Sequence, residues 1–186
     1  MSSLKDQTDI SGFLGGSLAV RKVNGKVVIK NRPERKMGDP SVKQQAVQKK
    51  FLKAAKYAKT QMEDADLKAL YETGITEKKK NAFAVAFSDS INAPEVSEIK
   101  TAEFTGAAGD IIKIIATDDF KVVRVKVVIT GADANILEKG EAVQDKKNAE
   151  LWRYFTTVAN PSLGGTKISA TAFDTPDNET TLEKVL

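Results

Sequence analysis

The chain of 186 residues contains 29 Lys and Arg, 25 Asp and Glu, no cysteine and no histidine, with a formal net charge of +4. This composition excludes disulfides, zinc sites of the usual Cys/His kind, and Ser-His-Asp or Cys-His catalysis. The charge is uneven: residues 1–96 hold 18 basic and 11 acidic side chains, a net of +7, whereas residues 97–186 hold 11 and 14, a net of −3.

Residues 1–19 are rich in Ser and Gly, and we expect them to form a flexible N-terminus. They do not resemble a secretory signal, because Asp6 and Asp9 occupy the region that would be positively charged. No uninterrupted apolar stretch is long enough to span a bilayer. We therefore expect a cytoplasmic protein that does not bind membranes, and the lack of cysteine fits a reducing compartment. Export by a route that needs no signal stays open.

A basic hairpin followed by a helical segment is predicted over residues 20–94, which we treat as one domain. Asn24-Gly25 separates two short β-prone runs, a pattern typical of a two-residue hairpin. After a break at residues 32–40, Ser41 is a suitable N-cap for a helix that runs to about Met62. Its apolar stripe consists of Val47, Phe51, Ala54, Ala55, Ala58 and Met62.

Two further helices are expected before the sequence changes character. The first begins at Asp64 or Asp66 and is closed by Gly74, and the second runs from about Thr76 to Ile91. The N-terminal half is therefore expected to contain one hairpin and about three helices.

Residues 97–186 are predicted to form a separate β-sandwich domain. Strands about ten residues apart are expected at 98–105, 110–117, 121–130, 135–143, 151–158, 166–173 and 179–185. Seven short antiparallel strands over this length are typical of an immunoglobulin-like or fibronectin-III-like sandwich. The fold class is therefore α+β.

The strongest β signal is the stretch 111–130, in which two β-branched runs flank the turn Asp118-Asp119. In the second run alternate residues are expected to face the core, namely Val123, Val125, Val127 and Ile129. Other inward positions are expected at Ile112, Ile114, Ala116, Trp152, Tyr154, Val158, Ile168, Ala170 and Ala172.

Two phrases in this half resemble signatures of bacterial immunoglobulin-like domains. ATDDFKVVRVKVVI at 116–129 resembles A-x-D-D-x-x-x-V-x-x-V-x-V, and ISATAFDTPDNET at 168–180 resembles A-x-D-x-x-G-N-x-T, with Asp177 in place of the glycine. Residues 24–36, 41–59 and 67–74 are similar to a Bacteroidetes family of unknown function, which pairs a G-K-x-x-x-R-x-x-P hairpin with a Q-x-x-x-R/K-x-x-F-x-x-A helix. Neither resemblance implies a particular activity, and immunoglobulin-like folds serve binding and spacing roles above all.

A calcium site is one candidate. In a sandwich of this topology the second-to-third and sixth-to-seventh connections lie at the same end. This would bring together the oxygen-bearing side chains of Asp118, Asp119, Asp174, Asp177 and Asn178. Oxygen ligands suit Ca²⁺. The alternative is that these are ordinary turn residues, because Asp and Asn commonly bond local backbone groups.

Polyanion binding, including nucleic-acid binding, is a second candidate. Residues 20–60 hold 13 basic side chains and two acidic ones. A basic surface of this kind neutralises phosphates. The candidate contacts are Arg21, Lys22, Lys26, Lys30, Arg32, Arg35, Lys36, Lys49, Lys53 and Lys56. The alternative is a solvated face, because Phe51 is expected in the core and only Tyr57 is free to stack on bases.

Catalysis is not expected, because the acidic residues Glu138, Glu141, Asp145 and Glu150 have no accompanying nucleophile or phosphate-binding glycine loop. The hypothesis we favour is a non-enzymatic structural or protein-interaction module, whose basic half docks on a partner protein or on copies of itself. Polyanion binding and calcium-dependent binding are the alternatives, and Ca²⁺ is the one cofactor considered.

Overall fold

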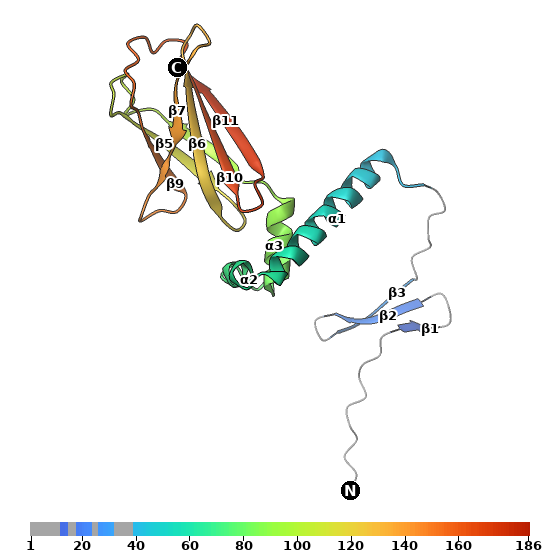
Figure 1. The fold of residues 1–186 in the computed structure, drawn as a ribbon. Coiled ribbons are helices and arrows are strands. Elements are labelled where there is room, and N and C mark those ends of the chain that lie inside the picture. Colours follow the sequence, from blue (N-terminus) through green and yellow to red (C-terminus); the bar gives the residue numbers. More distant parts are fainter. Residues whose placement is uncertain (1–11, 15–17, 24–25, 32–38) are drawn as a thin grey trace. The chain divides into compact units, whose positions relative to one another are not determined.

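A computed structural model of the protein describes residues 12–14, 18–23, 26–31 and 39–186. The chain divides into two compact units, Met1–Ser41 and Val42–Leu186 (Figure 1). The described residues form antiparallel sheets and helices, which confirms the α+β class with a β-sandwich. None of the described helices has both the length and the apolar character needed to cross a membrane.

The first unit contains a three-stranded antiparallel sheet in the order β1-β2-β3, with β1 at Gly12–Leu14, β2 at Leu18–Val23 and β3 at Lys26–Asn31. Strands β2 and β3 pair from Leu18 with Asn31 to Val23 with Lys26, as a hairpin requires. The connecting residues 24–25 lie outside the described residues, as does most of the N-terminus expected to be flexible.

The second unit begins with three helices: α1 (Val42–Glu63), α2 (Ala65–Glu72) and α3 (Ala82–Ile91). Asp64 caps α2 by accepting hydrogen bonds from the backbone amides of Asp66 and Leu67. The prediction that the third helix starts at Thr76 is wrong. It starts at Ala82, because Asn81 is its N-cap and accepts from the amide of Ala84 at 2.8 Å. The lysines at 78–80 therefore lie before the helix and not in its first turn.

The helices enclose a small core of their own, made of Ala58, Tyr71, Ala82, Val85 and Ala86. Phe120, which belongs to the sandwich, packs on this core, with its ring centroid 4.9 Å from that of Tyr71. The prediction that Phe51 lies in the core is wrong, because the apolar stripe of α1 is buried only in part. Ala54 and Ala58 are buried, but Val47 is 56% exposed and Phe51 is 52% exposed.

The sandwich consists of two four-stranded antiparallel sheets, β11-β10-β6-β7 and β4-β5-β9-β8. In the described chain its strands are β4 (Glu95–Lys100), β5 (Ile111–Thr117), β6 (Val122–Thr130), β7 (Ile136–Glu141), β8 (Val143–Gln144), β9 (Leu151–Phe155), β10 (Lys167–Asp174) and β11 (Glu179–Val185). The stretch 135–143, expected as one strand, is divided between β7 and β8 in opposite sheets. A seven-stranded immunoglobulin-like arrangement stays a prediction.

The side chains between the two sheets form the main core, which includes Ile112, Ile114, Val125, Val127, Ile129, Trp152, Tyr154, Ile168, Ala170 and Ala172, all predicted to point inward. Val123 is 44% exposed, contrary to prediction, and Val122 is buried in its place. The cause is an irregularity in the pairing of β6 with β10, where Phe173 pairs with Arg124 but Asp174 pairs with Val122. Val158 is also exposed, because β9 ends at Phe155.

Candidate metal centre

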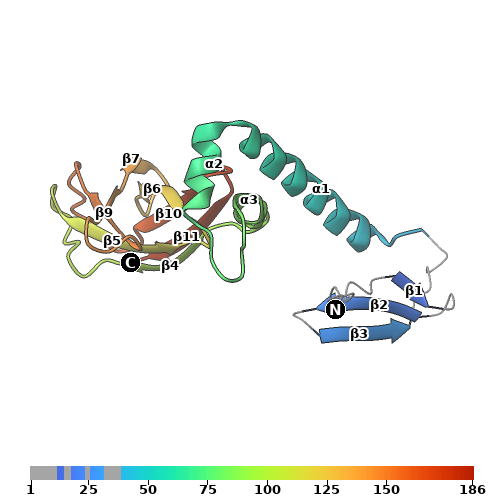
Figure 2. The same ribbon diagram turned by 90° about the horizontal axis from the view of Figure 1, so that it is seen from below.

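Helix α3 reaches one end of the sandwich (Figures 1 and 2). Three carboxylates meet at this end. Asp89 comes from α3, Asp118 from the β5–β6 turn, and Asp174 from the last position of β10. Each offers an oxygen, and the three oxygens lie within 4.8 Å of one another. Asp89 and Asp174 are fully buried. We call these three residues the carboxylate cluster.

Asp89 is held by a chain of hydroxyl groups. The Tyr71 hydroxyl donates to Asp89 Oδ2 at 2.7 Å, and the hydroxyls of Tyr57 and Tyr71 are also 2.7 Å apart. Because the single Tyr71 proton points to Asp89, Tyr57 is the donor to Tyr71. The other Asp89 oxygen, Oδ1, is buried and accepts no hydrogen bond from the described residues. Burial raises the pKa of Asp89 to about 8, and the negative charges of Asp118 and Asp174 raise it further. The hydrogen bond from Tyr71 lowers the pKa, but its effect is smaller than that of burial.

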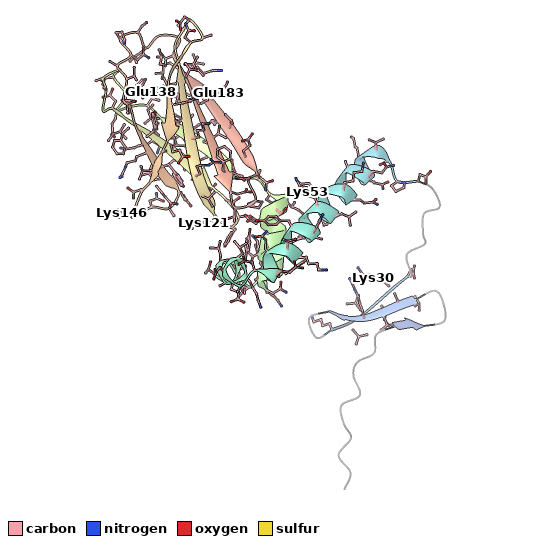
Figure 3. The ribbon with its side chains drawn as sticks, viewed as in Figure 1. Lys30, Lys53, Lys121, Glu138, Lys146 and Glu183 are labelled. Carbon is pink, nitrogen blue, oxygen red and sulfur yellow. The ribbon has the colours of Figure 1, made fainter. Side chains whose placement is uncertain are left out.

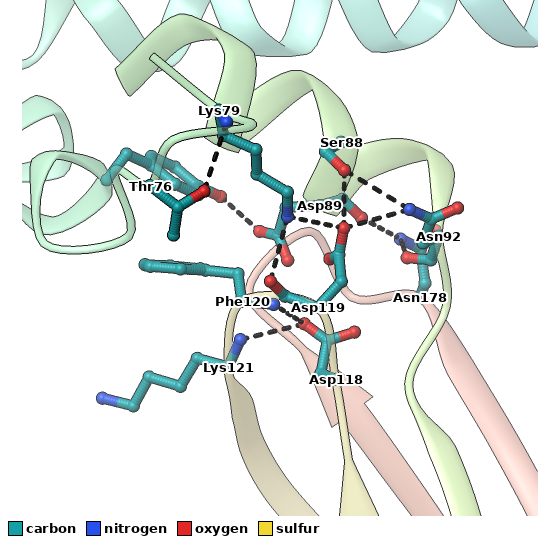
Figure 4. Close-up of polar contacts among 11 residues, drawn as sticks. Thr76, Lys79, Ser88, Asp89, Asn92, Asp118, Asp119, Phe120, Lys121 and Asn178 are labelled. Carbon is teal, nitrogen blue, oxygen red and sulfur yellow. Dashed lines mark hydrogen bonds and ion pairs between the residues drawn. The ribbon is translucent and has the colours of Figure 1, made fainter. Parts of the chain in front are cut away.

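Asp118 is fixed by the turn in which it lies. Its Oδ2 accepts from the backbone amides of Phe120 and Lys121 at 3.0 and 2.9 Å (Figure 4). Its Oδ1 is buried and, among the described residues, has no hydrogen-bond partner. Two of the three carboxylates therefore each present one oxygen whose hydrogen-bonding capacity is unused.

Both carboxylate oxygens of Asp174 accept hydrogen bonds within the turn that follows β10. Its Oδ1 accepts from the amide of Asn178 at 2.6 Å, and its Oδ2 accepts from the Asn178 side chain at 2.7 Å. Burial raises the pKa of Asp174 to about 6, although the bonds from Asn178 oppose the rise. The Asn178 side chain also donates to the backbone oxygens of Asp89 and Asn92, which links the turn to α3 (Figure 4).

Asp119 lies beside the cluster but has other partners. Its Oδ2 accepts from Lys79 Nζ at 2.7 Å, Ser88 Oγ at 2.5 Å and Asn92 Nδ2 at 3.0 Å (Figure 4). Burial alone would raise the pKa of Asp119, but these donors outweigh burial and lower it. Asp177 points outward, with a side chain 83% exposed and 3.8 Å from Arg124.

The structure thus brings together three of the five residues considered for calcium, Asp118, Asp174 and Asn178. Sequence reasoning missed Asp89. A signal was present, because Ala82, Val85, Ala86 and Asp89 follow helical spacing on one apolar face, where a carboxylate is unusual.

The cluster has no positive partner among the described residues, since the nearby Lys79 pairs with Asp119. Two fully buried carboxylates and a partly buried third cannot all be ionised without compensation, so a proton or a cation must lie among them. Ligands that are all oxygen favour a hard cation over zinc or copper.

The basic residues considered for polyanion binding belong to different units. Lys49, Lys53 and Lys56 are exposed on α1, and Lys30 is exposed on β3. Lys30 and Lys53 are labelled in Figure 3. Arg21, Lys22 and Lys26 also belong to the first unit. Arg32, Arg35 and Lys36 lie outside the described residues. Tyr57 is not free to stack, because its hydroxyl is bonded in the helical core. Polyanion binding stays a prediction.

Comparison with known proteins yields little. No protein-family model matches the chain, and no match is found among curated proteins. The crystal structure of CopC from Methylosinus trichosporium OB3b is similar with a TM-score of 0.35 and 6% sequence identity, over 48% of this chain and 87% of CopC. A similarity of this size carries no argument about function.

Proposed function

We propose that the protein is a non-enzymatic structural module that self-associates through the N-terminal half of α1. The observation that carries this proposal is the uncovered part of the α1 stripe. Ala54 and Ala58 are buried and Ala58 belongs to the helical core, but the same stripe continues through Phe51 and Val47, which are 52% and 56% exposed. These two residues have the i, i+4 spacing of anchors that enter a groove.

Aromatic rings enlarge the exposed apolar surface of α1 at the place where α3 no longer covers it. The rings of Phe51 and Phe87 meet edge to face at 5.5 Å, and Phe83 stacks on Phe87 at 6.2 Å. Phe83 is itself 41% exposed. We call Val47, Phe51 and Phe83 the apolar patch. Half-exposed aromatic residues next to one another are typical of interface anchors.

Charge supports a second copy of the chain as the occupant. Helix α1 carries the lysines 43, 49, 50, 53, 56 and 59 and one acidic residue, Glu63. Residues 97–186 carry a net charge of −3, so the sandwich of one copy is complementary to α1 of another. Lys43 and Val47 also line a shallow surface hollow, which gives an incoming side chain a place to lie.

Sedimentation velocity of the full chain over a wide range of concentration tests the proposal. We expect concentration-dependent association, weakened about tenfold by Phe51→Ser with Val47→Ser, because two apolar anchors are lost. Added salt should weaken it as well, since the lysines are exposed.

The matched control is Leu52→Ser. Leu52 is 71% exposed but lies off the stripe, so this substitution should leave association unchanged. A monomer at every concentration, or equal loss in the control, would contradict the proposal.

A further inference from the structure

We infer that Asp89, Asp118 and Asp174 together bind one Ca²⁺ ion, which ties α3 to the end of the sandwich. This site is separate from the apolar patch and does not depend on self-association.

The first support is the pair of unused oxygens. Asp89 Oδ1 and Asp118 Oδ1 are both buried without a hydrogen-bond partner in the described chain, and Asp89 is 0% exposed. A buried carboxylate oxygen without a hydrogen-bond partner lowers the free energy of unfolding, and proteins rarely contain such an oxygen. Here two of them belong to residues whose oxygens converge, so one bound cation would satisfy both.

The second support is the size of the cluster. Ca²⁺ binds oxygens at about 2.3–2.6 Å, so two ligands on opposite sides of the ion lie about 4.6–5.2 Å apart. The three oxygens of the cluster lie within 4.8 Å of one another, so a single Ca²⁺ ion can contact all three. Mg²⁺ binds at about 2.0–2.1 Å and demands octahedral geometry, which carboxylates from three separate segments meet less readily.

The third support is the way the ligands are held. The turns fix Asp118 by two backbone amides and Asp174 by Asn178, while Tyr71 orients Asp89. Groups of this kind orient ligands around a metal. Ca²⁺ takes about six to eight oxygen ligands, so water must supply those that the three carboxylates do not.

Thermal unfolding of the full chain in EDTA and in excess Ca²⁺ tests the site. At about ten times the dissociation constant, a bound ion should raise the melting temperature by about 4 °C. Asp89→Asn and Asp118→Asn should abolish the rise, because each removes a charged ligand. Both variants should still fold, since an amide oxygen can accept the bonds from Tyr71 or from the β5–β6 turn.

The matched control is Asp177→Asn. It makes the same substitution three residues from Asp174, at an exposed side chain where φ is +64°, a conformation that Asn tolerates well. This variant should keep the full rise.

Terbium luminescence gives a direct readout. Tb³⁺ occupies Ca²⁺ sites, and excitation of Tyr71, which touches Asp89, should sensitise its emission until Ca²⁺ displaces it. No rise in melting temperature with Ca²⁺ would show that a shared proton fills the cluster and would overturn the inference. An equal rise in Asp89→Asn would overturn it too, and a larger rise with Mg²⁺ would overturn the calcium assignment.

Discussion

At the scale of single residues, Asp110 closes the loop before β5. Its Oδ2 accepts from the Thr105 amide at 2.6 Å, the Thr105 hydroxyl at 3.0 Å, and the amides of Gly106 and Ala107 at 2.9 Å each. Burial alone would raise the pKa of Asp110, but these bonds together outweigh burial and lower it. The loop is tight, because a side chain at Gly106 would lie 2.2 Å from the backbone oxygen of Asn160.

The lowered pKa of Asp110 predicts part of the acid sensitivity of the protein. The ionised form is favoured in the folded state, so its contribution is present above the unfolded pKa of about 3.9 and is lost as pH falls through the lower folded value. Asp110→Asn should lower the urea midpoint at neutral pH and reduce the further loss below about pH 4. The exposed control Asp39→Asn should change neither, and an unchanged acid slope in Asp110→Asn would refute the prediction.

Only part of the carboxylate cluster could be predicted from the sequence. Asp118 and Asp174 could be predicted to meet, because both follow strand patterns whose turns lie at one end of a sandwich. The presence of Asp89 depends on where α3 docks, and no periodicity encodes the docking of a helix. Asp177 looked equivalent to Asp174, but a turn points neighbouring side chains in different directions.

At the scale of elements, the segment after α2 is closely packed against the sandwich. A Cβ added at Gly74 would lie 2.6 Å from Phe120 Cδ2 and 2.8 Å from Val85 Cγ1. We therefore predict that Gly74→Ala destabilises the protein by about 1–3 kcal/mol, because the ring and the valine must both shift. Gly164→Ala, where nothing lies within 4 Å, should stay within about 0.5 kcal/mol of wild type. Urea unfolding measures both, and equal effects would count against this packing.

The elements that sequence reasoning misplaced share a physical reason. The alternation in β6 is real from Val125 to Ile129, but an irregular pairing with β10 shifts Val123 outward, and pairing is a property of two strands. Likewise the stripe on α1 is a true helical pattern, yet α3 is too short to cover all of it. Local patterns predicted the elements, and their partners decided which residues are buried.

At the scale of the whole molecule, the helices and the sandwich belong to one compact unit, Val42–Leu186. Phe120 of the sandwich completes the helical core, and Asp119 bonds to Lys79, Ser88 and Asn92. The division into domains 20–94 and 97–186 implies that the two parts can fold independently, and it stays a prediction. The contacts of Asp119 with the helices provide a way to test this domain division.

We predict that the helices and the sandwich unfold together and that Asp119→Ala uncouples them. Trp152 is the only tryptophan and lies in the sandwich core, so its fluorescence reports the sandwich, while far-ultraviolet circular dichroism reports mainly the helices. In wild type the two signals should change at the same urea concentration. Asp119→Ala removes the acceptor of three donors, so the helical signal should be lost first, at a cost of about 1–3 kcal/mol.

The control for this prediction is Asp145→Ala. Asp145 pairs with Arg153 at 2.5 Å and accepts from the amides of Lys147 and Asn148, all within the sandwich. Its loss should lower stability while both signals stay coincident, because no contact to the helices is removed. If the two signals already separate in wild type, the helices fold independently and Asp119 does not couple them. If they stay together in Asp119→Ala, the apolar contact of Phe120 with Tyr71 is sufficient to join the two parts.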